Sequence, residues 1–130
     1  MTRKYAMRNW WWLSGLLSAG VATASAAPVG SLADKQHGEV VFRACAGCHH
    51  ERADATGPDL HGVVGRKAGA LDGFRYSNAM KRANLVWTVE NLRAYLRDPQ
   101  AVVKGNRMPF PGLPADSDVD DVVAFLESFK

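Results

Sequence analysis

The stretch Cys45-Ala46-Gly47-Cys48-His49 carries the most information about this chain. Residues three and four apart share one face of a helical turn, so two thiols and an imidazole can reach one planar group from a short segment. Two cysteines separated by two residues and followed by a histidine are the pattern for covalent attachment of a c-type haem. In that pattern the thiols form thioethers with the two vinyl groups and the histidine binds the iron, which are the roles expected of Cys45, Cys48 and His49. No second such pattern occurs in the sequence, which therefore predicts one haem.

Cys45 and Cys48 are the only cysteines in the chain, and two other uses of them are open. A disulfide between them would close a very short loop and stabilise little by loop entropy, so it would serve thiol redox exchange. A zinc site is the second alternative, but a structural zinc site needs four ligands and the sequence has no second cysteine pair. The adjoining His49 and an N-terminal export signal favour the haem.

The first 26 residues have the pattern of a secretory signal peptide. Three basic residues among the first eight precede an apolar run over 10–21, and an Ala-x-Ala site ends at Ala26. The run is shorter than the roughly 20 residues that a membrane span needs. We therefore predict cleavage after Ala26, a periplasmic location and no membrane span after processing, with an uncleaved anchor as the alternative. The predicted domains are a signal peptide, 1–26, and a monohaem domain, 27–130.

The charge balance depends on that leader. The 130-residue chain has 16 Lys and Arg against 13 Asp and Glu, a net charge of +3, and the surplus lies in the first eight residues. Removal of the leader leaves a neutral polypeptide, so nucleic-acid binding by bulk charge is not expected. About 100 residues are enough for one small domain and exclude a multidomain enzyme.

Met108 is the predicted ligand at the sixth position of the iron. It lies in Gly105-Asn106-Arg107-Met108-Pro109-Phe110-Pro111-Gly112, a stretch too rich in glycine and proline to form a helix or a strand. Met80 instead fits a short helix capped by Ser77, and we expect it to pack inward. His61 and an open sixth position are the alternatives.

Apolar residues at helical spacing, with capping residues before them, predict an all-α domain. Pro99 ends the second main helix because the residue before a proline disfavours helical geometry. Gly38 lies inside the first main helix, where glycine lowers helix stability by up to about 1 kcal/mol relative to alanine. We therefore expect the backbone of the last helix to approach Gly38 closely. Apolar and polar residues do not alternate with a period of two over enough residues to predict a sheet. Residues 57–73 are predicted to form a loop. The main helices are expected over 34–48, 88–98 and 118–129, with N-caps at Asp34, at Thr88 and at Ser117 or Asp118.

From about Lys35 to Phe129 the sequence resembles the class I cytochromes c, close to the soluble mitochondrial and bacterial carriers. The ensemble of matches is far more specific than the haem pentapeptide alone. The matching residues follow in register: Gly38 and Phe42, Cys45 to His49, Gly57-Pro58-Asp59-Leu60-His61-Gly62, Gly65-Arg66-Lys67, Gly69, Phe74-Arg75-Tyr76-Ser77, Trp87, Tyr95-Leu96, Pro99 and Met108-Pro109-Phe110.

The resemblance implies the cytochrome c fold, with the helices and loops wrapped around one covalent haem c, and a role for each matching residue. The Pro58 carbonyl accepts a hydrogen bond from the His49 ring, Tyr95 meets the sulfur of the Met108 ligand, and Phe110 shields the haem edge. The residues implied to hydrogen-bond the haem propionates are Arg66, Tyr76, Ser77 and Trp87. For two of them an alternative is open: Arg66 as a solvated loop cation, and Trp87 as a plain core residue.

Met80 and Asn106 are among the departures from the family pattern. Met80 stands where the family usually has a buried asparagine, so the hydrogen bonds beneath the haem differ. Asn106 replaces a threonine just before the ligand, which leaves a propionate contact at that position open.

The resemblance also implies an electron carrier that is not an enzyme, a monomer that cycles Fe(III) and Fe(II) with His and Met ligands. A quinol-oxidising complex or a dehydrogenase would be the donor, and an oxidase or a reductase the acceptor, as in a respiratory chain. A haem subunit of a periplasmic enzyme complex, or a gas- or peroxide-reactive haem protein with a labile sixth ligand, is the alternative. Residues 61–107 hold nine basic and three acidic side chains while 114–130 hold one and five, which predicts a basic region near the Met108 loop.

Overall fold

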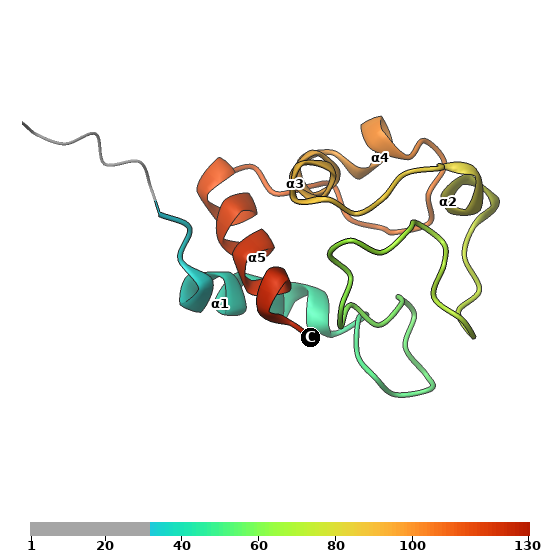
Figure 1. Cartoon of the computed structure of the whole chain (residues 1–130), viewed down its shortest axis with the longest axis horizontal. Coiled ribbons are helices and arrows are strands. Elements are labelled where there is room, and N and C mark those ends of the chain that lie inside the picture. Colours follow the sequence, from blue (N-terminus) through green and yellow to red (C-terminus); the bar gives the residue numbers. More distant parts are fainter. Residues whose placement is uncertain (1–31) are drawn as a thin grey trace, which may run out of the picture.

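The computed structural model describes residues 32–130, so the predicted leader, its cleavage site and the start of the domain at residue 27 lie outside the described residues. An isolated antiparallel bridge between Lys67 and Val86 is the only pairing of extended backbone in this part of the chain. None of its helices has the length and apolar character needed to cross a membrane. The all-α prediction is confirmed (Figure 1) by five helices: α1 (Lys35–Ala46), α2 (Asn78–Arg82), α3 (Val89–Arg97), α4 (Pro99–Val102) and α5 (Asp116–Ser128).

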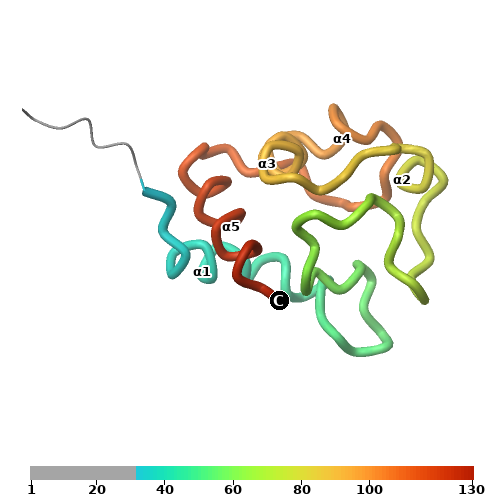
Figure 2. Tube along the Cα trace, in the orientation of Figure 1, coloured from blue at the N-terminus to red at the C-terminus, as the bar shows by residue number. Residues whose placement is uncertain are grey.

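The first and last helices of the described residues, α1 and α5, cross and pack against each other (Figure 2). Asp34 is the N-cap of α1, as predicted, and its carboxylate accepts hydrogen bonds from the N–H groups of Gln36 and His37 in the first turn. Gly38 faces α5, where a Cβ would lie 1.9 Å from the carbonyl oxygen of Asp121. The predicted close approach of the two backbones is confirmed, and it lets the rings of Phe42 and Phe125 meet with centroids 5.1 Å apart.

The start of α5 differs from the prediction. The helix begins at Asp116 with Ala115 as its N-cap and no capping side chain, so the predicted cap at Ser117 or Asp118 is wrong. Asp116 and Asp118 instead occupy the first turn, where the positive end of the helix dipole favours carboxylates.

Helices α3 and α4 meet at Asp98. Thr88 caps α3 as predicted, and Pro99 cannot continue that helix because it has no N–H to donate. The same proline starts α4, with Asp98 as N-cap accepting from the Ala101 N–H at 3.0 Å. An Asp-Pro pair can start a helix as well as follow the end of one. The sequence analysis used only the second property and did not predict α4.

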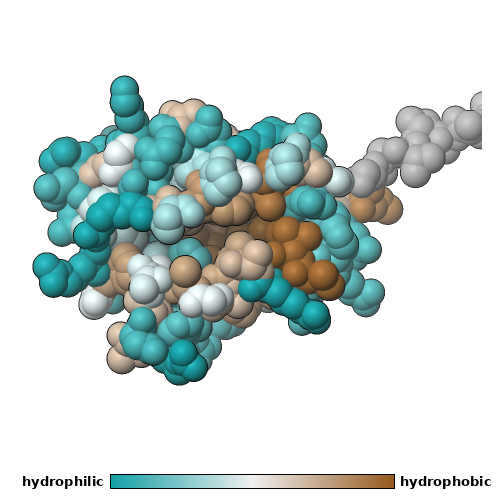
Figure 3. Space-filling view, turned by 180° about the vertical axis from the view of Figure 1, so that it is seen from behind, coloured by the Kyte–Doolittle hydropathy of each residue, from teal (hydrophilic) through white to brown (hydrophobic). Residues whose placement is uncertain are grey.

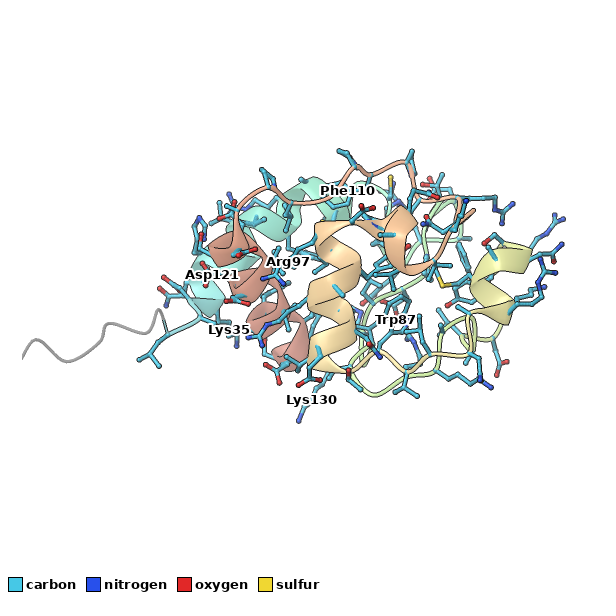
Figure 4. The ribbon with its side chains drawn as sticks, turned by 90° about the horizontal axis from the view of Figure 1, so that it is seen from above. Lys35, Trp87, Arg97, Phe110, Asp121 and Lys130 are labelled. Atoms are coloured by element: carbon cyan, nitrogen blue, oxygen red, sulfur yellow. The ribbon has the colours of Figure 1, made fainter. Side chains whose placement is uncertain are left out.

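The segment between α4 and α5 passes back over α3. The Leu113 N–H donates to the Leu96 carbonyl at 2.8 Å, and the Arg97 side chain reaches from α3 to Asp116 of α5, with 2.7 Å between Nε and Oδ1 (Figure 4). In the view of Figure 1 this segment lies in the upper half of the molecule, and most of the long connection from α1 to α2 lies in the lower half. Helices and connections therefore enclose the interior from both sides.

Candidate functional site

A cavity of about 730 Å³ lies in the interior, lined by α1, α2, α3, α5 and the connections from α1 to α2, from α2 to α3 and from α4 to α5. Its volume falls within the roughly 300–1,000 Å³ typical of ligand and cofactor sites, and its lining is mainly apolar. Figure 3 shows the hollow with hydrophobic side chains inside and beside it. Every candidate site residue lines it: Cys45, Cys48, His49, Pro58, Arg66, Tyr76, Ser77, Trp87, Tyr95, Met108 and Phe110.

His49 is held by the backbone around it. Its Nδ1 lies 2.7 Å from the Pro58 carbonyl oxygen, and because a carbonyl only accepts, Nδ1 carries the proton. Burial lowers the pKa of His49, and the Pro58 hydrogen bond opposes that shift. A Cβ at Gly57 would lie 2.6 Å from the ring, so only glycine lets the imidazole rest against this loop. The neutral ring keeps Nε2 available for a metal ion.

The two thiols stand at the end of α1, beside that imidazole. The helix ends at Ala46, earlier than predicted, but the N–H groups of Cys48 and His49 both donate to the Cys45 carbonyl, at 3.0 and 2.9 Å. This turn places three side chains of the motif on one cavity wall. Neither cysteine forms a disulfide, and burial raises the pKa of the Cys45 thiol. Between residues 32 and 130 no three His, Cys, Asp or Glu side chains come together as a metal-ion cluster.

Met108 lies in the segment between α4 and α5, half-buried, with its carbonyl accepting from the Phe110 N–H at 2.9 Å. Met80 is half-buried against the core, as predicted, and also lines the cavity. His61, the alternative ligand, is engaged elsewhere. Its Nδ1 lies 2.7 Å from Asp59, and its ring lies against Phe129 with centroids 3.6 Å apart.

The polar groups of the cavity each have a defined setting. Arg66 donates to the backbone carbonyls of Asp59 and His61, at 2.7 and 3.1 Å, and is held in place by them rather than freely solvated. The Ser77 oxygen accepts from the Met80 N–H at 3.1 Å, which leaves its O–H free to donate. Burial raises the pKa of Tyr76, while the nearby Arg66 charge lowers it.

Trp87 and Tyr95 form the buried aromatic wall of the cavity (Figure 4 labels Trp87). Their rings meet edge to face, with centroids 4.8 Å apart. Burial raises the pKa of Tyr95 to about 12, so its hydroxyl stays protonated and remains a donor at physiological pH.

The sequence analysis named Asn106 only as a departure from the family pattern and missed its role, and it did not single out Asp121. Asn106 is buried and bonded to the Met108 backbone, and an asparagine two residues before a backbone donor is a recognised turn signal that could have found it. Asp121 is buried and contacts Asp34 and His37, which are 87 and 84 residues away, so no local pattern could have found it.

The comparisons with known proteins agree with this geometry. Over 100 residues, covering 75% of this chain and 94% of the relative, the chain is 43% identical to cytochrome c2 of Rhodoblastus acidophilus. Cytochrome cH from Methylobacterium extorquens superposes with a TM-score of 0.70 at 41% identity, covering 73% of this chain and 98% of that one. Ferricytochrome c2 from Rhodopseudomonas palustris gives 0.68 at 38% identity, covering 75% and 99%.

An all-α fold around an apolar cavity, with a Cys-x-x-Cys-His turn in its wall, defines a c-type haem protein. Residues 36–130 match the family described as Cytochrome c, and the chain belongs to that family. It carries one covalent haem c and is an electron carrier rather than an enzyme, as the resemblance predicted.

Proposed function

We propose that this protein is a periplasmic carrier of single electrons, with the haem iron held between His49 and Met108. The observation that carries the proposal is that both side chains line the one cavity that also receives the two thiols. The bound haem supplies the one-electron exchange between Fe(III) and Fe(II). The chain holds the porphyrin, keeps water from most of it and sets its potential through the ligands.

On the proximal side, Pro58 fixes both the orientation and the donor strength of the imidazole. Because the Pro58 carbonyl accepts the Nδ1 proton, the ring carries more electron density to Nε2 and stabilises Fe(III). On the other side, a neutral thioether favours Fe(II) and raises the potential relative to two histidines. A potential raised in this way suits transfer from a quinol-oxidising complex or a dehydrogenase to an oxidase or a reductase.

The polar cavity groups are proposed to hold the propionates. Ser77 has a free O–H, Tyr76 has its O–H, and Arg66 has further N–H groups beyond the two that bind backbone carbonyls. Trp87, Tyr95 and Met108 line the same cavity, where Trp87 would contribute its indole N–H and the Tyr95 hydroxyl would donate toward the Met108 sulfur. Phe110 lines this cavity as well and would cover the haem edge.

A basic face lies at one side of the cavity. Arg75 and Arg107 line the cavity itself, and Arg82 and Lys104 line the neighbouring surface hollow, which also includes Arg107. All four are exposed, and none has a carboxylate within 4.0 Å among residues 32–130. The Arg107 side chain also donates to the Arg75 carbonyl at 2.5 Å, which holds these two parts of the basic face next to each other. Unpaired cations near the cofactor support docking of an acidic redox partner in a small, transient contact.

The near-infrared spectrum of the oxidised protein tests the His49–Met108 assignment. A weak sulfur-to-iron charge-transfer band is expected in the native protein and should be absent in the Met108→Ala variant. Met80→Leu, a matched change at the other half-buried methionine, should keep the band. Rapid binding of carbon monoxide by the native ferrous protein at neutral pH would instead support the reactive haem protein with a labile ligand.

Two further measurements address the leader and the partners. Mass spectrometry of the native protein should show a chain that begins at Ala27 and carries one haem, and acidified acetone should leave the colour on the polypeptide. Co-purification tests the remaining alternative, because a fixed subunit stays with its enzyme complex while a free carrier is isolated as a monomer.

A further inference from the structure

Asn106 is one of two buried polar side chains in the core of the described residues, with 7% of its surface exposed. A buried carboxamide is stable only when its groups are hydrogen-bonded, since an unmade bond costs about 1–3 kcal/mol. It has two N–H donors and one carbonyl oxygen to satisfy.

All three are engaged. Nδ2 donates to the carbonyls of Pro99 and Val103, both at 2.9 Å, and Oδ1 accepts from the Met108 N–H at 2.9 Å. The partners fix the orientation of the amide, because two carbonyls require the NH2 group and a backbone N–H requires the oxygen. Both side-chain donors are occupied, so no side-chain N–H of Asn106 remains for a haem propionate. Asn106 therefore does not take over the propionate contact of the threonine that the family usually has at this position.

The groups bound by Asn106 belong to a rigid element. Pro99 is fully buried at the start of α4, and Val103 is the residue that ends that helix. The Asn106 N–H also donates to the Val103 carbonyl at 3.0 Å. The carboxamide therefore ties the Met108 backbone to α4 at the position where the ligand loop leaves the helix.

We propose that Asn106 is the positioning residue for Met108: it anchors the ligand's backbone N–H to α4 and so holds the thioether at the iron. The inference rests on Met108 being the sixth ligand. Without the anchor the loop is free to move outward, and the iron–sulfur bond must then order the loop by itself. The lost hydrogen bonds would appear as easier displacement of Met108 by an external ligand.

Imidazole binding to the oxidised holoprotein measures that displacement, because imidazole enters the sixth position only when the methionine leaves. In Asn106→Leu, which keeps the size of the side chain and removes all three bonds, we expect an affinity for imidazole about tenfold higher than in the native protein. The near-infrared band should also fade at a lower temperature relative to global unfolding. Asn106→Thr keeps an oxygen that can accept from the Met108 N–H, so the increase should be about threefold.

Gln100→Ala is the matched control. The Gln100 side chain bonds the Gly105 N–H and the Asn106 carbonyl, at 3.0 and 3.2 Å, in the same loop but without touching the Met108 N–H. We expect its affinity for imidazole to stay within about twofold of the native value.

Three outcomes separate the possible failures. If Asn106→Leu and Asn106→Thr are less stable but bind imidazole with native affinity, Asn106 has only a structural role and the proposal is wrong. If Asn106→Leu does not retain haem, the imidazole affinity of Asn106→Thr alone decides: a native value contradicts the proposal, and an increase of about threefold supports it. A native protein that lacks the near-infrared band would instead overturn the assignment of Met108 itself.

Discussion

Gly38 of α1 lies against the Asp121 backbone of α5, so close that a Cβ at position 38 would be 1.9 Å from the Asp121 carbonyl oxygen. No flexible side-chain end is available to move aside, because the obstructing atoms are backbone. The two helices that begin and end the described domain can therefore cross at this point only with glycine there.

Gly38→Ala should destabilise the protein by about 2–3 kcal/mol, because the overpacked helices must separate and the gain in helix propensity, up to about 1 kcal/mol, does not compensate. Guanidinium unfolding of the oxidised holoprotein measures the change. Val40→Ala, at an exposed position of the same helix, should change stability by no more than about 0.5 kcal/mol. Equal effects of the two substitutions would contradict the close crossing.

The ion pair between His37 and Asp121 predicts a pH dependence of stability. Nδ1 of His37 lies 2.8 Å from Asp121 and 3.9 Å from Asp118. The Asp121 hydrogen bond raises the pKa of His37 above 6.5, and the Asp34 N–H, then His37, lower the pKa of Asp121 below 3.8. The His37 contribution is therefore complete below pH 6.5 and is lost as pH rises through the raised value. The Asp121 contribution is complete above pH 3.8 and is lost as pH falls through the lowered value.

Unfolding of the native protein and of His37→Gln, compared between pH 5 and pH 9, isolates this effect. The difference in unfolding free energy between them should be largest near pH 5 to 6 and should shrink at higher pH. An NMR titration of His37 should give a midpoint above 6.5 that falls in Asp121→Asn. A native midpoint at or below 6.5 would rule out the pair as a source of stability.

Gly57→Ala should disturb the proximal ligand, because the new Cβ would lie within 2.6–2.7 Å of two atoms of the His49 ring. Moving the ring weakens its bond to the Pro58 carbonyl, lowers the donor strength of the imidazole and so raises the reduction potential. Loss of one hydrogen bond, about 1 kcal/mol, corresponds to roughly 40 mV for one electron. Protein-film voltammetry measures the potential, and Asp54→Ala, exposed in the same loop, should leave it unchanged. A lower potential in Gly57→Ala would contradict the geometry.

Electron transfer to an acidic partner should slow as salt is added, but less steeply than for a lysine-rich mitochondrial carrier, because the basic face has four cations and the predicted mature chain has no net charge. Exchange of Lys104 and Arg107 for glutamine should lower the second-order rate about threefold at low ionic strength and have little effect at high ionic strength. Lys35→Gln, at the start of α1, serves as the control. Stopped-flow kinetics over a series of salt concentrations measure both, and a steep native dependence would contradict the prediction.

Much of this site could be predicted from the sequence, because its chemistry is local. The Cys45 to His49 turn needs only helical spacing, and Met108 stands out in a segment that cannot be helical. The caps at Asp34, Ser77 and Thr88 were also found, since each lies within three residues of the N–H groups it satisfies. The start of α5 was misplaced because Ala115, which has no capping group, precedes it.

The amino-acid sequence by itself determined the haem attachment and the existence of the three main helices, since thiol chemistry and helix periodicity act over a few residues. Only the tertiary structure decided how Asn106 is used, that His61 is held away from the cavity by Asp59 and Phe129, and that Asp121 is buried beside His37. Those facts depend on which backbone carbonyl, ring or carboxylate the fold brings near, and elements far apart in the chain supply many of these neighbours.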